Sequence, residues 1–570
     1  MHGNRKNGAE LMVELLDGHG VQHIFGLCGD TSLPFYDALA RLDHGITHVL
    51  SRDERHAAYM ADAYARVTGK VGVCEGPSGG GATYILPGLV EAQDSSVPVL
   101  AITTDVATTA AGRFPLTELD QEALFRPVTK WNRVIPSVEL LPRIVRKAFR
   151  ELTTGRPGSV HLGLPFDVQI SETTDDDPDG ANPESGFYPS HAVAPDIGAV
   201  EAVLDALADA RSPVIICGGG VILSGATAEL EELASALEIP VCTSVSGQGT
   251  LPDAHPLLVG VVGSNGGRPA TRQLVDEADC VFFIGCRAGS VTTERWRSPA
   301  PGVTVLHLDI DPSTIGANYR TRAAMVCDAR LGLQALREAL PSYPTAAVAA
   351  TKDAGNGIER VASARARKWE GFPVRVADDA IPIRPERVVA ELQARLPEDA
   401  IICADPGTPC PFFSAWYRWP RAGRHFITNR AHGALGFAIG AAVGAQFGRP
   451  EARVVAATGD GSFGMSVGEL ETICRYALPI KIVVFSNASF GWIKAGQKSG
   501  FGKRYFSVDF SRTDHAAVAA AYGIRSWTVS RPGDIGKALE AAMRHDGPAL
   551  VDLLTEPLED ADAPVSEWVA

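Results

Sequence analysis

The chain lacks paired cysteines, long apolar runs and an excess of positive charge. Its ten cysteines stand singly, so the sequence indicates neither a zinc site nor a disulfide framework. No apolar run is long enough to span a bilayer, and the first residues contain no apolar signal core. A net charge of −15 argues against nucleic acid as a partner. We therefore expect a cytoplasmic protein with reduced thiols that binds neither membranes nor nucleic acid.

The chain has 570 residues, which is too long for one hydrophobic core, so several domains are expected. Apolar strand-like runs alternate with helix-like segments, and this alternation predicts parallel sheets covered by helices on both faces. Two connections interrupt it: an acidic stretch at 172–193, rich in Pro, Gly and Ser, and residues 345–383, which contain a helix-like segment at 357–369. The expected α/β fold has three domains, and the third echoes the first. The domains are residues 8–185, 194–345 and 384–560.

The most informative stretch begins with Gly-Asp-Gly-Ser at 459–462, directly after an apolar strand-like run. A helix-like segment and a second apolar run, 480–485, then lead to Asn487. The Gly-Asp-Gly triplet alone is usually a turn, but neighbouring parallel strands end side by side, so Asp460 and Asn487 are expected to converge. A carboxylate and an amide oxygen suit Mg²⁺, and Gly461 with the following helix can receive a phosphate. The spacing therefore predicts a metal-bridged diphosphate site.

This stretch resembles the thiamine-diphosphate-binding motif of the family that includes acetolactate synthase, pyruvate oxidase and benzoylformate decarboxylase. The resemblance implies thiamine diphosphate and Mg²⁺ as cofactors, with Asp460, Asn487 and the backbone carbonyl of Ser489 as metal ligands. It covers nearly the whole chain in matching order. It therefore implies a pyrimidine-binding first domain, a central domain and a diphosphate-binding third domain. It also implies a homodimer or homotetramer, because in this family two subunits contribute to each site.

The candidate catalytic acid is Glu54, which follows the strand-like run 47–50 and opens a helix-like segment. Taken alone, a Glu in a first helical turn is usually a surface charge that complements the helix dipole. Residues 52–66, however, resemble the family helix whose Glu activates the aminopyrimidine ring of the cofactor. A carboxyl group in such a poorly solvated place is expected to have a raised pKa. Asp53 and Arg55 depart from the His and Gln that are usual in the family.

Other segments resemble further parts of the family's cofactor site. The glycine-rich run 430–444 resembles the segment that bends the cofactor, with Leu435 as the wedge between its rings and Gly433 as a carbonyl acceptor for its amino group. A second role open to this run is close helix packing. Thr408 follows a strand-like run and could touch the diphosphate at a helix start, and the turn 77–83 resembles the one beside the pyrimidine. The cofactor-binding residues implied are Thr408, Gly433, Leu435, Gly459, Asp460, Gly461, Ser462 and Asn487.

The expected substrate pocket departs from that of acetolactate synthases. After the metal loop those enzymes read Gly-Met-Val-x-Gln-Trp, and the Trp shapes the acceptor site; here Gly496 stands in its place. We expect the opened pocket to take a bulkier or anionic 2-oxo acid, with Lys494 nearby. Gln121 either points into the pocket or lies on a surface helix. The expected pocket residues are Gln121, Trp492, Lys494 and Gly496.

The resemblance implies a lyase or transferase that decarboxylates a 2-oxo acid, joins it to a second carbonyl compound, or does both, as acetolactate synthase does. A second class is a FAD-dependent oxidase of the pyruvate oxidase type. Glycine turns at 217–220 and 285–289 resemble segments that bind FAD in some relatives, so FAD is a possible cofactor of the central domain. A third class is a lyase or hydrolase that cleaves a C–C bond next to a carbonyl, and a fourth is a non-catalytic homologue.

Overall fold

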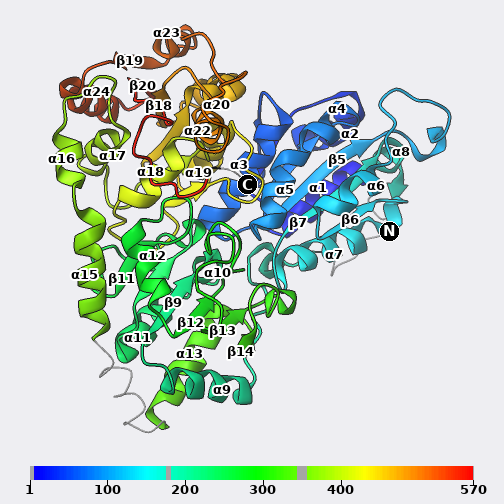
Figure 1. Ribbon diagram of the computed structural model, residues 1–570. Helices are drawn as coiled ribbons and strands as arrows, with labels where there is room; N and C mark the ends of the chain where they lie inside the picture. Colours follow the sequence, from blue (N-terminus) through cyan, green and yellow to red (C-terminus); the bar gives the residue numbers. More distant parts are fainter. Residues whose placement is uncertain (1–4, 175–180, 343–355, 569–570) are drawn as a thin grey trace. The chain divides into compact units, whose positions relative to one another are not determined.

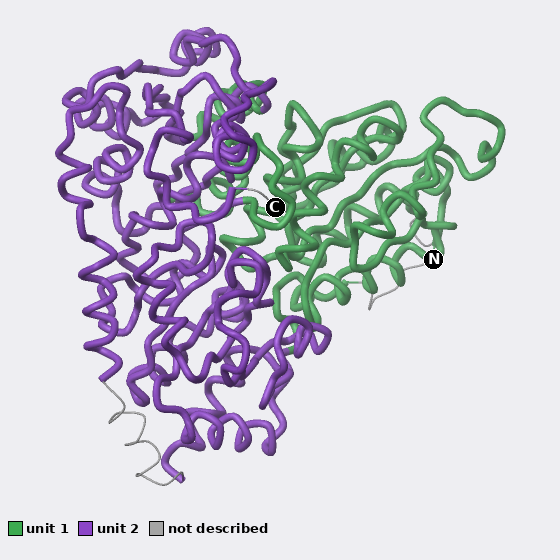
Figure 2. The backbone as a smooth tube through the Cα atoms, in the orientation of Figure 1, with its two compact units in different colours: residues 1–191, 429–451, 466–478 green, residues 192–428, 452–465, 479–570 purple. Residues whose placement is uncertain are grey.

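The computed structural model describes residues 5–174, 181–342 and 356–568 (Figure 1). The chain divides into two compact units, coloured separately in Figure 2. The first unit comprises residues 1–191, 429–451 and 466–478, and the second comprises 192–428, 452–465 and 479–570. Parts of both expected connections, 175–180 and 345–355, lie outside the described residues.

The described residues form three six-stranded sheets, and every ladder within these sheets is parallel. The sheet of the first unit has the order β3-β2-β4-β5-β7-β6. The second unit holds the sheets β11-β10-β9-β12-β13-β14 and β16-β15-β17-β18-β20-β19. Counted from its own first strand, the third sheet repeats the order of the first. The predicted α/β fold with parallel sheets is confirmed, and so is the echo between the first and third sections.

The first unit surrounds its sheet with helices and adds a short antiparallel pair, β1 with β8. Its strands are β1 (Lys6–Asn7), β2 (His23–Gly26), β3 (Thr47–Leu50), β4 (Gly72–Gly76), β5 (Val99–Asp105), β6 (Trp131–Val134), β7 (Ser159–Pro165) and β8 (Glu172–Thr173). Its helices are α1 (Gly8–Gly18), α2 (Leu33–Arg41), α3 (Glu54–Thr68), α4 (Gly80–Tyr84), α5 (Leu86–Asp94), α6 (Gln121–Phe125), α7 (Leu141–Thr153), α8 (Phe166–Ile170), α19 (Phe437–Gly448) and α21 (Glu469–Arg475).

The second unit alternates strands with helices in both of its sheets. Its strands are β9 (Pro213–Cys217), β10 (Val241–Thr243), β11 (Leu258–Val261), β12 (Cys280–Ile284), β13 (Thr304–Asp309), β14 (Thr321–Val326), β15 (Ile401–Ala404), β16 (Phe426–Thr428), β17 (Val454–Gly459), β18 (Lys481–Ser486), β19 (Arg525–Val529) and β20 (Ala549–Leu554). Its helices are α9 (Ile197–Ala208), α10 (Gly219–Leu223), α11 (Thr227–Leu237), α12 (Pro269–Asp276), α13 (Ala329–Ala339), α15 (Gly357–Trp369), α16 (Phe372–Ala377), α17 (Pro385–Gln393), α18 (Pro409–Trp416), α20 (Asp460–Ser466), α22 (Gly491–Gly500), α23 (His515–Ala521) and α24 (Pro532–Arg544). Among the described residues, no helix of either unit is long and apolar enough to cross a membrane.

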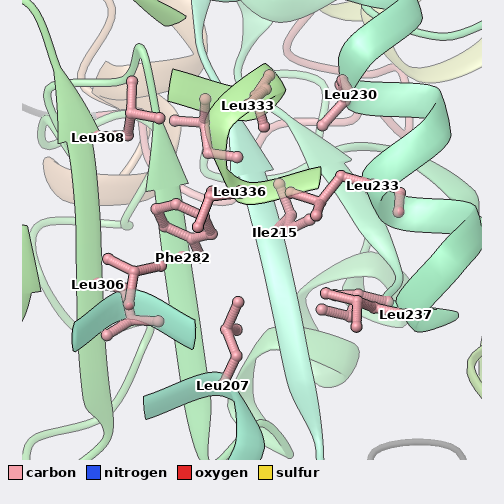
Figure 3. Close-up of a cluster of buried hydrophobic side chains, with 14 of the residues drawn as sticks. Leu207, Ile215, Leu230, Leu233, Leu237, Phe282, Leu306, Leu308, Leu333 and Leu336 are labelled. Carbon is pink, nitrogen blue, oxygen red and sulfur yellow. The ribbon is translucent and has the colours of Figure 1, made fainter. Parts of the chain in front are cut away.

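The second sheet is buried on both faces. Figure 3 shows the core on one face, which includes Leu207 of α9, Leu233 of α11, Leu336 of α13, Ile215 of β9 and Phe282 of β12. The alternate residues of the same two strands, Val214, Ile216, Val281 and Phe283, belong to the core on the other face. Successive side chains of a strand point to opposite faces, so a strand covered on both sides must be apolar at every position. This requirement explains the continuous apolar runs of the sequence.

Helix α19 packs closely against α3 through a line of glycines. A Cβ added to Gly444 would lie 1.9 Å from the Met60 carbonyl oxygen, and one added to Gly440 would lie 3.4 Å from the His56 Cβ. Gly448 continues the line, and the spacing of four residues places all three glycines on one helix face. The close-packing role of the glycine-rich run is therefore confirmed.

Candidate functional site

Asp460 and Asn487 meet at the carboxyl end of the third sheet. Asp460 follows β17, and Asn487 follows its parallel neighbour β18. The Asp460 Oδ2 accepts hydrogen bonds from the backbone N–H of Asn487 at 2.7 Å and of Ala488 at 2.6 Å. The other carboxylate oxygen accepts from the Gly461 N–H at 2.9 Å. The structure therefore brings the two residues together, as the spacing of the sequence predicts.

The glycines and hydroxyls expected around the diphosphate lie at the same edge. A Cβ on Gly461 would lie 2.8 Å from the Phe490 ring, so this position has room for glycine alone without a shift of that ring. Gly459 ends β17, and Ser462 is buried in the first turn of α20. Packing against the Phe490 ring therefore accounts for the glycine at position 461.

Thr408 lies at the topological switch point of this sheet. In this sheet β15 and β17 are neighbours, and the chain continues from β15 to β16 on one side of this pair and from β17 to β18 on the other. The switch point lies between β15 and β17. Ligands of open α/β sheets bind in the crevice outside the strand ends at such a point. Thr408 is buried directly before α18. The Thr458 hydroxyl donates to the Asp405 carboxylate at 2.7 Å and so joins the loop after β15 to the end of β17.

Glu54, the first residue of α3, is a buried carboxyl group with only 5% of its surface exposed. A Cβ on Gly81 would lie 3.1 Å from its Oε1, and one on Gly76 would lie 3.2 Å from its Cγ, so Glu54 rests against the glycine turn 77–83. Burial raises the pKa of Glu54, and the negative charges of Asp53 and Glu75 raise it further. The interpretation of Glu54 as a surface helix charge is wrong, and the expected rise of its pKa is found.

Asn429 holds the loop that carries Gly433 and Leu435. The Asn429 Oδ1 accepts from the Gly433 N–H at 2.7 Å, and its Nδ2 donates to the Ala434 carbonyl at 3.1 Å. Gly433 has φ of 73°, a conformation that favours glycine. Leu435 is half-buried at the end of this loop, where a large apolar side chain is available to a ligand. Asn429 therefore fixes the loop's shape.

Family models of thiamine pyrophosphate enzymes match three parts of the chain. The N-terminal thiamine pyrophosphate binding domain matches residues 6–124, the central domain 200–336 and the C-terminal thiamine pyrophosphate binding domain 407–553. The chain is 36% identical over 565 residues to the probable acetolactate synthase large subunit of Methanococcus aeolicus. The aligned region covers 97% of this chain and 92% of that protein. The chain is 33% identical over 557 residues to the acetolactate synthase isozyme 2 large subunit of Escherichia coli (strain K12), with 97% and 96% covered. The chain belongs to the thiamine pyrophosphate enzyme family.

Membership of this family makes the protein an enzyme that uses thiamine diphosphate, as the sequence predicts. The same findings favour carboligation of 2-oxo acids over the flavin oxidase. The acetolactate synthase large subunit of Lactococcus lactis subsp. lactis (strain IL1403) is a further relative, 32% identical over 555 residues, with 97% of this chain and 93% of that protein covered.

The oxygen atoms near Asp460 fit a hard cation. The Asn487 Oδ1 accepts long hydrogen bonds from the Ser489 N–H at 3.2 Å and its hydroxyl at 3.3 Å, which a cation could replace. Burial raises the pKa of Asp460, and a nearby cation would offset that cost. The described parts of the chain contain no cluster of three or more His, Cys, Asp or Glu suited to a metal. Mg²⁺ in this enzyme would therefore depend on one carboxylate together with amide and carbonyl oxygens.

Sequence reasoning missed Glu91, which is fully buried in α5. Its carboxylate accepts from the backbone N–H of Ala431 at 3.0 Å and of His432 at 2.8 Å, and it pairs with the Arg66 guanidinium at 3.0 Å. Arg66 also pairs with Asp62 at 2.7 Å. The sequence held part of the signal for this contact, because Asp62 and Arg66 match the family helix. Their partner Glu91 lies outside that motif. Glu91 thus connects the matched helix to the loop of Leu435.

We predict that Glu91→Gln lowers the free energy of unfolding by about 1–3 kcal/mol, because the amide NH₂ faces backbone donors that the carboxylate satisfied. The loosened loop should also weaken thiamine diphosphate binding in the folded enzyme. Denaturant titration and calorimetry with Mg²⁺ present measure the two effects. Ser95→Ala is the matched control, since the Ser95 hydroxyl donates to the same carboxylate at 2.6 Å without touching the loop. Normal cofactor affinity in folded Glu91→Gln would contradict the positioning role.

Gln121 lies inside the first unit, not on its surface. It begins α6 and exposes only 1% of its surface. Its Oε1 accepts from the Thr103 hydroxyl at 2.5 Å, and its Nε2 donates to the Thr104 carbonyl at 3.0 Å. Asp105, at the end of the same strand, has its pKa raised to about 6, chiefly by burial. The surface-helix interpretation of Gln121 is therefore wrong, because the residue belongs to a buried polar network at the end of β5.

Lys494 of α22 does not offer a free positive charge. Its ammonium group pairs with Asp509 at 2.7 Å and with Glu559 at 2.8 Å. These two partners raise the pKa of Lys494, with the hydrogen bond to Asp509 as the largest cause. An anionic substrate would have to compete with two carboxylates, so the expectation of a lysine-bound anion loses its basis.

The space beside Gly496 is filled by the same chain. A Cβ on Gly496 would lie 3.2 Å from the backbone oxygen of Trp568, near the end of the described residues. The Trp492 ring lies edge-on to the Trp568 ring, with 5.1 Å between centroids. The sequence predicts an open pocket at Gly496, but the C-terminal segment closes it there.

The glycine turns of the central domain pack against each other. A Cβ on Gly218 would lie 2.0 Å from the Gly285 carbonyl oxygen, and one on Gly220 would lie 2.8 Å from the Gly285 Cα. These turns follow β9 and β12, between which the strand order of the second sheet reverses. Backbone packing thus accounts for these glycines without a bound nucleotide.

Proposed function

We propose that this enzyme decarboxylates a 2-oxo acid and joins the remaining carbon unit to a second carbonyl compound. The observation that carries the proposal is the similarity to acetolactate synthases over 97% of the chain. The buried acid Glu54 and the convergence of Asp460 with Asn487 support it, since both suit thiamine chemistry. The relatives are acetolactate synthases, and on this ground we take 2-oxo acids as the substrate class.

Thiamine diphosphate, when bound, supplies the carbon nucleophile that attacks the keto carbon and takes up the electrons left by departing CO₂. In our proposal Glu54 holds a proton at its buried carboxyl group and shares it with the aminopyrimidine nitrogen. Asp460, Asn487 and the Ser489 carbonyl would hold Mg²⁺. The other proposed cofactor contacts are Thr408, Gly433, Leu435, Gly459, Gly461 and Ser462, and the proposed substrate contacts are Gln121 and Trp492. Lys494 and Gly496, expected in the substrate pocket from the sequence, contact other residues of the chain instead.

The domain boundaries and the assembly are also part of the proposal. The resemblance supports domains at 8–185, 194–345 and 384–560 and a cytoplasmic homodimer or homotetramer. Analytical ultracentrifugation of the purified enzyme tests the assembly. An absorbance spectrum of the same sample tests for FAD, because a bound flavin absorbs in the visible range.

We predict that pyruvate self-condensation is not the fastest reaction of this enzyme. Thr408 to Cys410 replace the Gln-His-Gln of acetolactate synthases, and Asp53 and Arg55 replace the usual His and Gln beside the catalytic acid. Even one methylene in a hydrophobic pocket changes discrimination between substrates by about 10- to 200-fold. The test is CO₂ release and product identity for pyruvate and for a panel of larger 2-oxo acids, with and without aldehydes. If pyruvate has the highest kcat/KM, the enzyme is an ordinary acetolactate synthase; if no 2-oxo acid releases CO₂, the proposed function is wrong.

A further inference from the structure

The C-terminal segment 559–568 lies along α22 and is attached to it by charge. The ammonium group of Lys498 donates to the Glu559 carbonyl and pairs with Asp560 at 3.4 Å. One helical turn earlier, Lys494 pairs with the Glu559 carboxylate at 2.8 Å. Glu559 is buried, so this attachment is partly shielded from solvent and stronger than a surface ion pair.

The end of the segment is fixed by a second set of contacts in the central domain. The Gly266 N–H donates to the Pro564 carbonyl at 2.8 Å, and the Ser566 N–H donates to the Ser264 carbonyl at 3.0 Å. Glu567 then pairs with Arg295 at 3.3 Å and also with Arg297. Hydrogen bonds and ion pairs therefore hold residues 564–567, which directly precede Trp568.

The backbone and Cβ of Trp568 cover Gly496, and its indole packs on Trp492 of the same helix α22. The Trp568 backbone oxygen would be 3.2 Å from a Cβ on Gly496, and its Cβ would be 4.0 Å from the same atom. Its ring meets Trp492 edge-on at 61°, an arrangement that stabilises aromatic pairs. Any larger side chain at position 496 would push the segment away, so glycine there is what admits Trp568.

This position is close to the metal loop. The helix α22 begins at Gly491, where an added Cβ would lie 3.7 Å from the Asn487 side-chain nitrogen and 2.9 Å from the Leu558 Cβ. The first residue of α22 therefore lies between the metal loop and Leu558, the residue directly before the C-terminal segment. Both lysines of α22 are paired with carboxylates, Lys494 with Asp509 and Glu559 and Lys498 with Asp560, so neither offers a free charge here.

We infer that Trp568 sets the size limit for the second substrate, taking over the task of the Trp that acetolactate synthases carry at the position of Gly496. The inference rests on the proposed carboligation. It assigns a specificity role to a residue outside the metal loop and α22, at the end of the described chain. The chemical class selected is a small carbonyl compound with an apolar substituent, because the contact between α22 and the C-terminal segment carries indole rings and no free lysine charge.

The test is a competition between acetaldehyde and benzaldehyde as second substrates, with one 2-oxo acid as donor. Trp568→Ala should raise the ratio of the benzaldehyde product to the acetaldehyde product by about 10- to 200-fold, the range for hydrophobic pockets. Glu567→Gln, which loosens the anchor and keeps the indole, should shift the ratio in the same direction by less. Trp527→Ala, on the edge strand β19, is the matched control and should leave the ratio as in the wild type.

A swap of the indole between the two positions makes the test decisive. In Gly496→Trp the new side chain should displace the segment, so the Ser566 N–H should exchange hydrogen for deuterium faster. In the double variant Gly496→Trp, Trp568→Ala the product ratio should return toward the wild-type value. An unchanged ratio in Trp568→Ala, in enzyme that still releases CO₂, overturns the inference and leaves the proposed function standing. If Trp568→Ala releases no CO₂, the product ratio of Glu567→Gln decides instead, and an unchanged ratio there overturns the inference. If the wild type releases no CO₂ from any 2-oxo acid, the proposed function itself is wrong.

Discussion

Replacing Glu54 by Gln is expected to lower turnover about 10²- to 10⁴-fold, the usual contribution of a positioned acid or base. The amide is nearly isosteric, so it fills the same place against Gly76 and Gly81, but it cannot exchange a proton with the cofactor. Binding of thiamine diphosphate should change much less, because its diphosphate and metal contacts lie in another part of the sequence. The measurements are kcat with the preferred 2-oxo acid and calorimetric affinity for the cofactor.

The same substitution should stabilise the protein without its cofactor. Burial, Asp53 and Glu75 raise the pKa of Glu54, so the folded state resists ionisation and binds more protons than the unfolded state. Stability due to this group is therefore lost as the pH rises above the ordinary glutamate pKa. Glu54→Gln removes that loss, so its melting temperature should exceed that of the wild type by an amount that grows as the pH rises from the ordinary glutamate pKa to the raised pKa of Glu54 and stays constant above it. A stabilised but inactive variant is the pattern expected at a site strained for function.

The chain offers a matched control in Glu10, which also lies in a first helical turn. Its carboxylate accepts from the Asn7 N–H in a capping box, and the hydrogen bond lowers its pKa. Glu10→Gln should cost stability and leave kcat unchanged, the reverse of Glu54→Gln. Near-normal turnover of Glu54→Gln would mean that Glu54 is a buried structural group and that activation proceeds without it.

The strands could be predicted because burial on both faces leaves a strong local signal. The predicted strand 47–50 coincides with β3, and the predicted helix 357–369 coincides with α15. The predicted apolar run 480–485 begins and ends one residue before β18. Convergence of Asp460 with Asn487 followed from topology alone, since both residues end neighbouring parallel strands.

The contacts that modify the site could not be predicted, because their partners are distant in sequence. Glu91 binds the backbone of His432, 341 residues away, and neither segment contains a local pattern that names the other. Gln121 is buried because it is hydrogen-bonded to Thr103, which lies on another element 18 residues earlier in the chain. Gly496 suggested an empty pocket because a local pattern cannot show that Trp568, 72 residues later in the chain, lies beside it. Local spacing thus defines the strand ends, whereas the walls of the site depend on long-range packing.

Asp460→Ala is expected to weaken metal-dependent cofactor binding strongly while the fold persists. Asp460 supplies the one carboxylate among the three proposed ligands, and Asn487 and Ser489 supply neutral oxygens. Loss of one partner of a buried charge pair costs about 2–5 kcal/mol, roughly 30-fold to several thousand-fold in Kd at about 1.4 kcal/mol per tenfold. Calorimetry with thiamine diphosphate at several Mg²⁺ concentrations measures it, and chelation of the wild type should release the cofactor until Mg²⁺ is restored.

Asp460→Ala also leaves the N–H groups of Gly461, Asn487 and Ala488 without their acceptor, so a loop rearrangement could mimic loss of the metal. Asp460→Asn separates the two effects, because it keeps the shape and one acceptor oxygen but removes the charge. The control is Asp328→Asn, which alters another buried aspartate with two backbone N–H donors, at the start of α13. Both variants should lose some stability, because the amide NH₂ faces backbone N–H donors that the carboxylate satisfied. Asp328→Asn should nevertheless bind the cofactor normally, whereas folded Asp460→Asn should bind it poorly. Full affinity in Asp460→Asn at low Mg²⁺ would exclude this carboxylate as the metal ligand and place the diphosphate's cation elsewhere on the sheet edge.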